Sequence, residues 1–334
     1  MFDFLVVGAQ INFWVLLALK LGAIAILIQA VVLPIIFAEL KLSAHMQSRI
    51  GPYFAGGRFG WAQPIADGLK FFQKEDLVPA AADKTVYKAA PYVALVGTVA
   101  VFVIIPFSPD LIVADLNLGI FYALAISSLS TLAVLMAGWS SGNKYSLIGG
   151  IRAAAQLIAY ELPLVLAVIG VVIQAGTLSM VGIVEAQIDM GVPYLIGGQI
   201  LGFGIFFIAS LAELNRTPFD MPIAESELVM GYLTEYSGFR FAAFFLGEYA
   251  GIFTMSAIAA TLFLGGYGFW GLDSTIFGPF VLAGKVGLLV FLMIWIRWTF
   301  PRFREDQLQS LAWRFLIPLS LGNIAVTAIF KVVL

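Results

Sequence analysis

About eight long apolar stretches, each near the length that crosses a lipid bilayer, constrain the fold of this chain more than any other feature. A helix of roughly 20 residues spans the membrane core. Hydrophobic residues make up 61% of the chain and charged residues 11%, against roughly 45–50% and 25% in soluble domains. The sequence therefore predicts an all-α, polytopic membrane protein, with residues 1–334 as a single integral membrane domain. The expected spans are 12–37, 91–109, 118–138, 153–175, 193–213, 241–265, 279–297 and 315–333.

The distribution of Lys and Arg predicts how the chain is oriented. Cytoplasmic loops of membrane proteins are enriched in these residues. All of the 18 basic residues except Lys20, Lys285 and Lys331 fall in, or at the edge of, the connections after the first, third, fifth and seventh spans. The alternate connections contain acidic residues but neither Lys nor Arg. This pattern places the large loops in the cytoplasm and both chain termini outside.

Residues 61–74 of the first large loop have the pattern of an amphipathic helix. Trp61, Ile65, Leu69 and Phe72 recur at helical spacing, and polar residues occupy the opposite side. Such a helix is expected to lie on the membrane surface with its apolar face in the lipid. The alternative is a helix that packs inside a folded loop.

Composition excludes several kinds of site. The net charge of −2 offers no basic face for nucleic acid. The chain has no cysteine, which excludes disulfides and thiolate ligands for zinc or iron–sulfur clusters. His45 is the single histidine, and no second metal ligand lies at a familiar spacing from it. We therefore expect no metal or cofactor on this chain, and any redox centre must belong to a partner.

Acidic residues within or beside the spans are the strongest functional candidates. Ionisable groups are costly in hydrocarbon, so those found there usually have a function. Carboxylates gathered near the inner membrane boundary favour a proton path, because proton carriers must titrate near neutral pH. For the loop acids alone, a solvated loop is an equally good interpretation. The candidates are Glu161, Glu213 and Glu248 in the spans and Asp220, Glu225, Glu227 and Glu235 in the loop.

Several motifs, in order along the chain, resemble those of one family. They are QSRIGP at 47–52 with QPIADGLK at 63–70, GWSSGNKYSL at 138–147 with YELP at 160–163, AELNRTPFD at 212–220 with ESELV at 225–229, and the region 302–319. On these residues the chain resembles the subunit 1 family of NADH:quinone oxidoreductase, respiratory complex I, whose bacterial member is called the H subunit.

The resemblance implies a subunit of a proton-translocating enzyme in the cell inner membrane, which joins the membrane arm to the peripheral arm. Its partners would be peripheral and membrane-arm subunits and membrane lipid, with flavin and iron–sulfur clusters on the partners and quinone as the substrate. The implied quinone chamber comprises Gln47, Arg49, Asp67, Lys70, Arg216, Phe219 and Asp220. The implied proton path comprises Glu161, Glu213, Glu225, Glu227, Glu235 and Glu248.

Three positions depart from the family pattern. Leu40, Ile223 and Glu305 stand where the family usually has Arg, Glu and Tyr. Two other functions fit parts of the sequence. The equivalent subunit of a membrane-bound hydrogenase would use the acids without quinone. An independent ion transporter would favour inverted repeats, and the sequence shows no such symmetry.

Overall fold

The computed structural model describes residues 13–268 and 275–333, and these residues form helices and loops without strands. Seven of the described helical segments are long and apolar enough to cross a membrane. An eighth apolar helix, α8, has 14 residues. A helix therefore lies in every predicted span. The helices are α1 Phe13–Met46, α2 Gln63–Gln73, α3 Lys84–Val101, α4 Gly119–Ser127, α5 Leu129–Ser140, α6 Lys144–Ala175, α7 Met180–Met190, α8 Ile200–Glu213, α9 Glu225–Leu228, α10 Gly238–Phe263, α11 Gly278–Thr299, α12 Glu305–Ser310 and α13 Ile317–Val333.

Several helices begin or end away from the predicted span boundaries, because polar residues begin or end helices that continue beyond the apolar stretch. Helix α6 begins nine residues before the predicted 153, where the side chain of Asn143 accepts a hydrogen bond from the Tyr145 backbone N–H at 2.9 Å. The last helical segment begins at Glu305, ten residues before the predicted span, because α12 continues through a π-helical turn, Leu311–Leu316, into α13. Conversely, α8 is shorter than the predicted 193–213.

Helix α7 was not predicted, because residues 176–192 were expected to form a plain connection. Its start is capped by Ser179, whose hydroxyl accepts from the Gly182 backbone N–H at 3.3 Å. Its end is Gly191, with φ of +72°, a left-handed conformation that glycine adopts without steric cost. Both are ordinary helix-end signals that were present in the sequence.

Helix α2 confirms the amphipathic helix predicted at 61–74, except that Trp61 lies in the turn before it. Ile65, Leu69 and Phe72 on its apolar face are exposed. The ring of Phe71 lies 5.6 Å from that of Phe241, at the start of α10. The apolar face of α2 is therefore free to contact lipid or a partner, while the helix itself is held beside α10.

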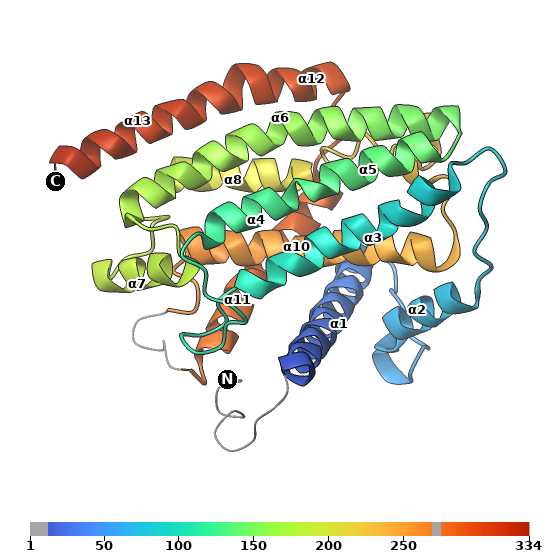
Figure 1. Cartoon of the computed structure of the whole chain (residues 1–334), viewed down its shortest axis with the longest axis horizontal. Helices are drawn as coiled ribbons and strands as arrows, with labels where there is room; N and C mark the ends of the chain where they lie inside the picture. The colour runs from blue at the N-terminus through green and yellow to red at the C-terminus, as the bar shows by residue number, and fades with distance from the viewer. Residues whose placement is uncertain (1–12, 269–274, 334) are drawn as a thin grey trace.

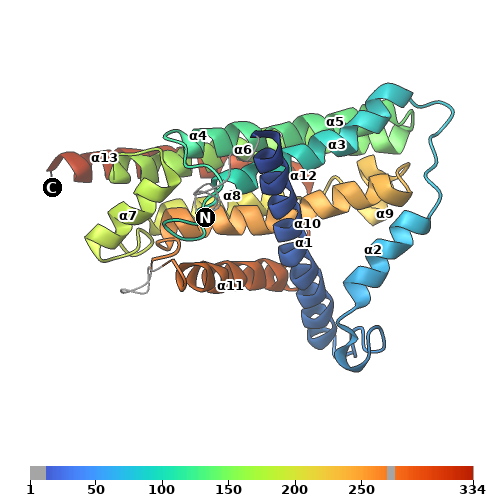
Figure 2. The ribbon, with the colours of Figure 1, turned by 60° about the horizontal axis from the view of Figure 1, so that its bottom comes forward.

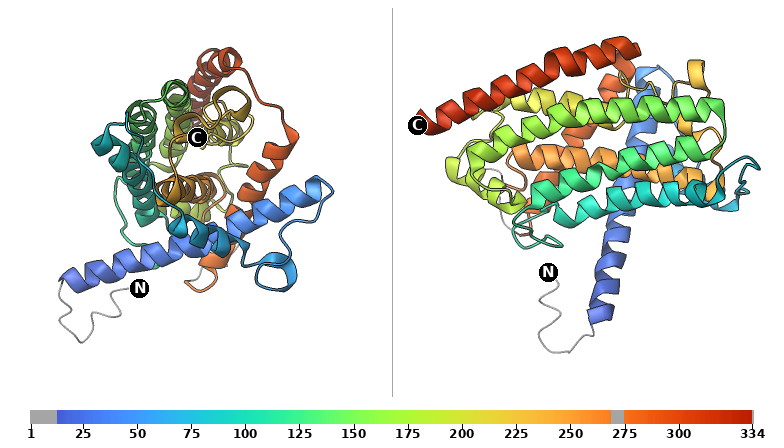
Figure 3. Two further views of the ribbon diagram at one scale, coloured as in Figure 1. Left: turned by 90° about the vertical axis from the view of Figure 1, so that its right-hand side faces the viewer. Right: turned by 45° about the horizontal axis from the view of Figure 1, so that its top comes forward.

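The long helices α3, α5, α6, α8, α10 and α13 form a bundle in which neighbours run side by side (Figure 1). Helix α1 crosses this bundle steeply and packs on α10 and α11 (Figures 2 and 3). The loop between α8 and α10 folds against the start of α6, at the same end of the bundle as α2. This end gathers the residues described below.

Two glycines let the loop between α8 and α10 approach α6. A Cβ added at Gly149 would lie 2.6 Å from the Cα of Gly231, a backbone atom that cannot move aside. Gly231 has φ of +55°, so it favours glycine on conformational grounds as well.

We therefore expect Gly149→Ala to lower the free energy of unfolding by about 1–3 kcal/mol, the usual cost of overpacking. Gly204 on α8 is the matched control, because no heavy atom lies within 4 Å of an added Cβ there. Thermal unfolding in detergent should show a lower midpoint for Gly149→Ala than for Gly204→Ala. Equal midpoints would contradict the close approach.

Candidate functional site

A buried ionic network joins three elements that are distant in the sequence. Arg216, just after α8, donates through Nη1 to both carboxylate oxygens of Glu39 on α1, each at 3.0 Å. Its Nη2 lies 3.0 Å from Oε1 of Glu248 on α10. The guanidinium also stacks 4.8 Å from the ring centroid of Tyr249. Arg216 is 5% exposed, so water cannot replace these partners.

A second arginine completes the network. Arg297, near the end of α11, donates to Oε1 of Glu39. Two guanidinium groups therefore balance two carboxylates, which is the condition under which buried charges are tolerated. Burial lowers the pKa of Arg216, but Glu248 and Glu39 outweigh burial and hold that pKa above its ordinary value. Arg216 therefore stays charged in this network.

Asp220 lies in the loop beside this network and pairs with Arg302, whose Nη2 is 2.9 Å from Oδ2. Burial raises the pKa of Asp220, and the opposing effect of Arg302 does not fully compensate, so the pKa lies above its ordinary value. Asp220 therefore takes up a proton at a higher pH than a free aspartate does.

A cavity of about 790 Å³ opens among these residues. Its volume is in the range of pockets that bind small organic molecules. Charged side chains form one part of its wall, and aromatic side chains from α10 and α11 form another. The wall includes Arg216, Asp220, Glu248, Arg297 and Arg302 together with Phe241, Phe245, Tyr249 and Trp298. We call this space the polar cavity.

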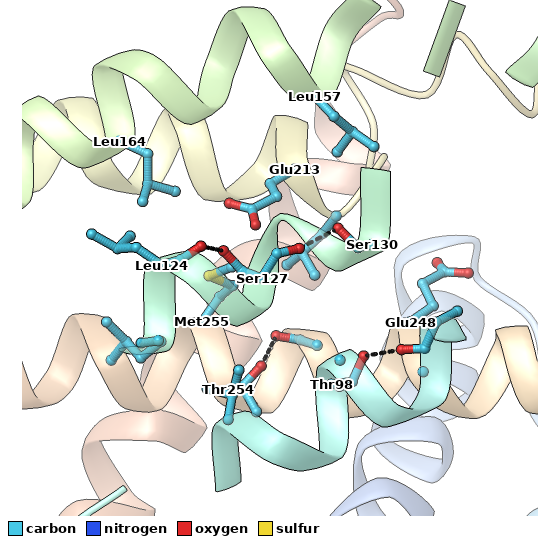
Figure 4. Close-up of a pocket in the computed structure, with 18 of the residues that line it drawn as sticks. Thr98, Leu124, Ser127, Ser130, Leu157, Leu164, Glu213, Glu248, Thr254 and Met255 are labelled. Carbon is cyan, nitrogen blue, oxygen red and sulfur yellow. Dashed lines mark hydrogen bonds between the residues drawn. The ribbon is translucent and has the colours of Figure 1, made fainter. Parts of the chain in front are cut away.

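A second cavity, which we call the inner cavity, lies deeper in the bundle, has a volume of about 120 Å³ and is mostly apolar. Figure 4 shows Glu213 and Glu248 well apart on the wall of this cavity. The wall also carries hydroxyl groups, among them that of Ser127 on α4. Glu248 and Asn215 belong to the walls of both cavities. The carboxylate of Glu248 is therefore the acid that the two cavities share.

Glu213 lines the inner cavity and not the polar cavity. Its Oε2 is buried with no hydrogen-bond partner among the described residues. It interacts electrostatically with Glu161, which is half-buried on α6, and with the hydroxyl of Ser127. An unpaired buried carboxylate oxygen is costly, so this position suits a group that exchanges a proton. No cluster of three or more metal-ligating His, Asp or Glu occurs in the described part of the chain.

Two of the remaining acids predicted for the proton path, Glu227 and Glu235, are absent from the described walls of both cavities. Glu227 is exposed and pairs with Arg152 at 2.6 Å. Oε1 of Glu235 accepts a hydrogen bond from Asn143 at 2.5 Å. The side chain of Glu225 lies outside the described residues. Of the predicted acids, the structure therefore brings Glu213 and Glu248 to one cavity, with Glu161 beside them.

The residues predicted for a chamber divide into two groups. Arg216 and Asp220 line the polar cavity, and Phe219 is buried behind it against Tyr160, at 5.2 Å between ring centroids. The other four lie at the end of α1 and on α2, outside the described wall of that cavity. Arg49 donates to Gln47 at 2.6 Å, and Lys70 lies 3.6 Å from Asp67.

Glu39, Arg297 and Arg302 had no predicted role at this site. Arg297 was used only for topology, and Arg302 for topology and as part of the region 302–319 that carries the resemblance, although both lie at or after the end of an apolar span. Glu39 gave the clearest missed signal, because it is an acid directly after the first apolar stretch.

The fold and the site together define a polytopic helical membrane protein with buried, paired charges and two adjoining cavities. The family model described as NADH dehydrogenase matches residues 19–328. The chain is 48% identical to the NADH-quinone oxidoreductase H subunit of Geobacillus kaustophilus (strain HTA426) over 95% of this chain and 96% of the relative. It is 50% identical to the H subunit of Bacillus mycoides (strain KBAB4), over 89% and 88%. The chain belongs to this NADH dehydrogenase family.

Proposed function

We propose that this chain is the H subunit of a proton-translocating NADH:quinone oxidoreductase and forms part of its quinone chamber. Its relatives carry that name, and the match covers 96% and 88% of their length. The observation that carries the proposal is the shared wall at Glu248, because it joins a polar cavity of ligand size to an inner cavity that holds a buried acid.

The polar cavity suits a quinone headgroup. Arg216, Arg297 and Arg302 supply hydrogen-bond donors, and the aromatic part of the wall suits a planar ring. The exposed apolar face of α2, beside the start of α10, suits the isoprenoid tail. Gln47, Arg49, Asp67 and Lys70 would shape the chamber from the α2 side, where peripheral partner subunits would complete it.

Reduction of a quinone to a quinol takes up two electrons and two protons. Electrons would come from iron–sulfur clusters and flavin on partner subunits, since this chain has no cysteine to ligate such a cluster. Glu248 borders the space where the headgroup would lie, and Glu213 and Glu161 continue inward from it. Glu225, Glu227 and Glu235 would extend this path at the loop surface. The large loops would face the cytoplasm of a cell whose inner membrane holds the complex.

Purification and crosslinking test this proposal together. The tagged chain, extracted in mild detergent, should bring down flavin and iron–sulfur subunits with NADH:quinone reductase activity. A photoreactive quinone should label the segments that line the polar cavity, and excess unlabelled quinone should compete. Nickel–iron subunits in place of flavin would favour the hydrogenase interpretation, and a stable chain without partners would favour an independent transporter.

The raised pKa of Asp220 predicts a pH effect. If the ionised Asp220–Arg302 pair orients the headgroup, quinone reduction should fall on acidification, beginning at a higher pH than an ordinary aspartate would give. Asp220→Asn is uncharged at every pH, so it should be slower near neutrality and lack this acid-side decline. Steady-state rates between about pH 4.5 and 8 bracket the transition.

A water-soluble electron acceptor that bypasses quinone provides the control at each pH. Its reduction by NADH should be the same in the wild type and in Asp220→Asn. The same acid-side decline in both enzymes with quinone would show that another group causes it.

A further inference from the structure

The side chain of Gln156 holds the turn that carries the site. Gln156 lies on α6 and is 2% exposed. Its Nε2 donates to the backbone carbonyl of Ala212 at 2.8 Å and to that of Phe219 at 2.7 Å. These two carbonyls immediately precede Glu213 and Asp220 in the chain. One amide group therefore fixes the backbone next to both acids.

The orientation of this amide follows from its neighbours. Backbone carbonyls only accept hydrogen bonds, so the NH₂ end must face Ala212 and Phe219. A third acceptor, Oδ1 of Asn215, lies 3.2 Å from the same nitrogen. The Oε1 atom of Gln156 is buried without a partner among the described residues. An apolar side chain would avoid that cost, which makes the two carbonyl contacts the distinctive contribution of glutamine here.

The turn between these carbonyls brings the two cavities together. The Arg216 backbone N–H donates to the Leu211 carbonyl at 3.1 Å, which closes the turn after α8. Asn215, within it, has φ of +50° and lines both cavities. A shift of this turn relative to α6 would move Glu213, Arg216 and Asp220 as one unit.

We propose that Gln156 is a positioning residue, which sets the turn that carries Glu213, Arg216 and Asp220 and so links the polar cavity to the inner cavity. This inference rests on the proposed function, since its readout is quinone reduction. Gln156 itself lies outside the described walls of both cavities, so it acts through the backbone and not by contact with substrate.

Gln156→Met tests the role, because methionine keeps the approximate volume and removes both donors. Gln174→Met is the matched control. Gln174 lies on the same helix, donates to a loop carbonyl, that of Gly197, at 2.9 Å, and also has a buried Oε1 without a described partner. Both variants should assemble, as shown by flavin and iron–sulfur subunits that co-purify with the tagged chain. Quinone turnover should fall on the order of tenfold in Gln156→Met and less than about twofold in Gln174→Met.

A double variant separates positioning from general destabilisation. If Gln156 acts through Asp220, the losses in Gln156→Met and Asp220→Asn should not multiply when the two changes are combined. Equal turnover in the Gln156→Met and Gln174→Met enzymes, or losses that multiply, would overturn the inference. If Asp220→Asn and Glu248→Gln also left quinone reduction unchanged, the proposed function itself would be wrong.

If Gln156→Met does not assemble, Gln156→Glu tests whether the hydrogen bonds donated by residue 156 position the turn. A protonated glutamic acid can donate one hydrogen bond to the turn, whereas the ionised form only accepts and repels both carbonyls. Quinone turnover relative to wild type should therefore rise as the pH is lowered. A pH profile parallel to that of the wild type would overturn the inference.

Discussion

Replacing Arg216 with methionine is expected to remove most of the assembled protein from the membrane. The change would leave Glu248 without an ion-pair partner among the described residues and Glu39 with Arg297 alone. Removing one partner of a buried ion pair costs about 3–5 kcal/mol, a large share of the stability of a typical domain. Native gel electrophoresis of solubilised membranes and thermal unfolding in detergent would measure the loss.

Two further variants identify the cause of that loss. Arg216→Met combined with Glu248→Gln should recover part of the assembled protein, because it removes the carboxylate that was left without an ion-pair partner. Arg304→Met is the surface control, since the Arg304–Asp306 pair is exposed and should contribute little. If Arg216→Met assembled as well as Arg304→Met, the buried network would not be needed for folding.

The spans could be predicted because hydropathy is a local property of the chain. The network of Glu39, Arg216 and Arg297 could not, because its partners are 177 and 258 residues apart in sequence. Nothing in a single sequence says which acid will meet which arginine across such distances. The resemblance supplied Arg216 and Glu248, but the pairing and Glu39 came from the fold.

For the loop acids, the sequence groups more residues than the described geometry brings together. Glu227 and Glu235 were grouped with the buried acids because of their proximity in sequence and because of the family resemblance. In the structure, Arg152 pairs with Glu227 at 2.6 Å and with Glu305 at 3.2 Å. These pairs tie the loop to α6 and tie α6 to α12. Their part in a proton path stays a prediction.

Two of the departures from the family pattern, Glu305 and Ile223, have identifiable surroundings in the structure. Glu305 supplies Arg152 with a second carboxylate, which the tyrosine usual at that position would not. Ile223 lines the polar cavity where the family usually has an acid. The wall of this cavity is accordingly less acidic and more apolar near Ile223, which should favour bound groups that are themselves apolar there.

Glu248→Gln is expected to give an assembled enzyme with quinone turnover lowered on the order of 100-fold, the lower end of what a positioned proton-transfer group contributes. Glutamine keeps the shape of the side chain and can still accept a hydrogen bond from Arg216. It cannot take up or release a proton, so it cannot pass one between the two cavities. Quinone turnover and proton uptake into sealed vesicles, followed with a pH-sensitive dye, would be measured on the same preparation.

Glu185→Gln on α7 is the matched control, because Glu185 is an exposed glutamate that is absent from the described walls of both cavities. It should behave as wild type. Glu213→Gln should resemble Glu248→Gln in proton uptake, since both acids line the inner cavity, but Glu213 is absent from the described wall of the polar cavity. The affinity for quinone should therefore change less in Glu213→Gln. Normal turnover and proton uptake in both variants would show that protons do not travel through the inner cavity.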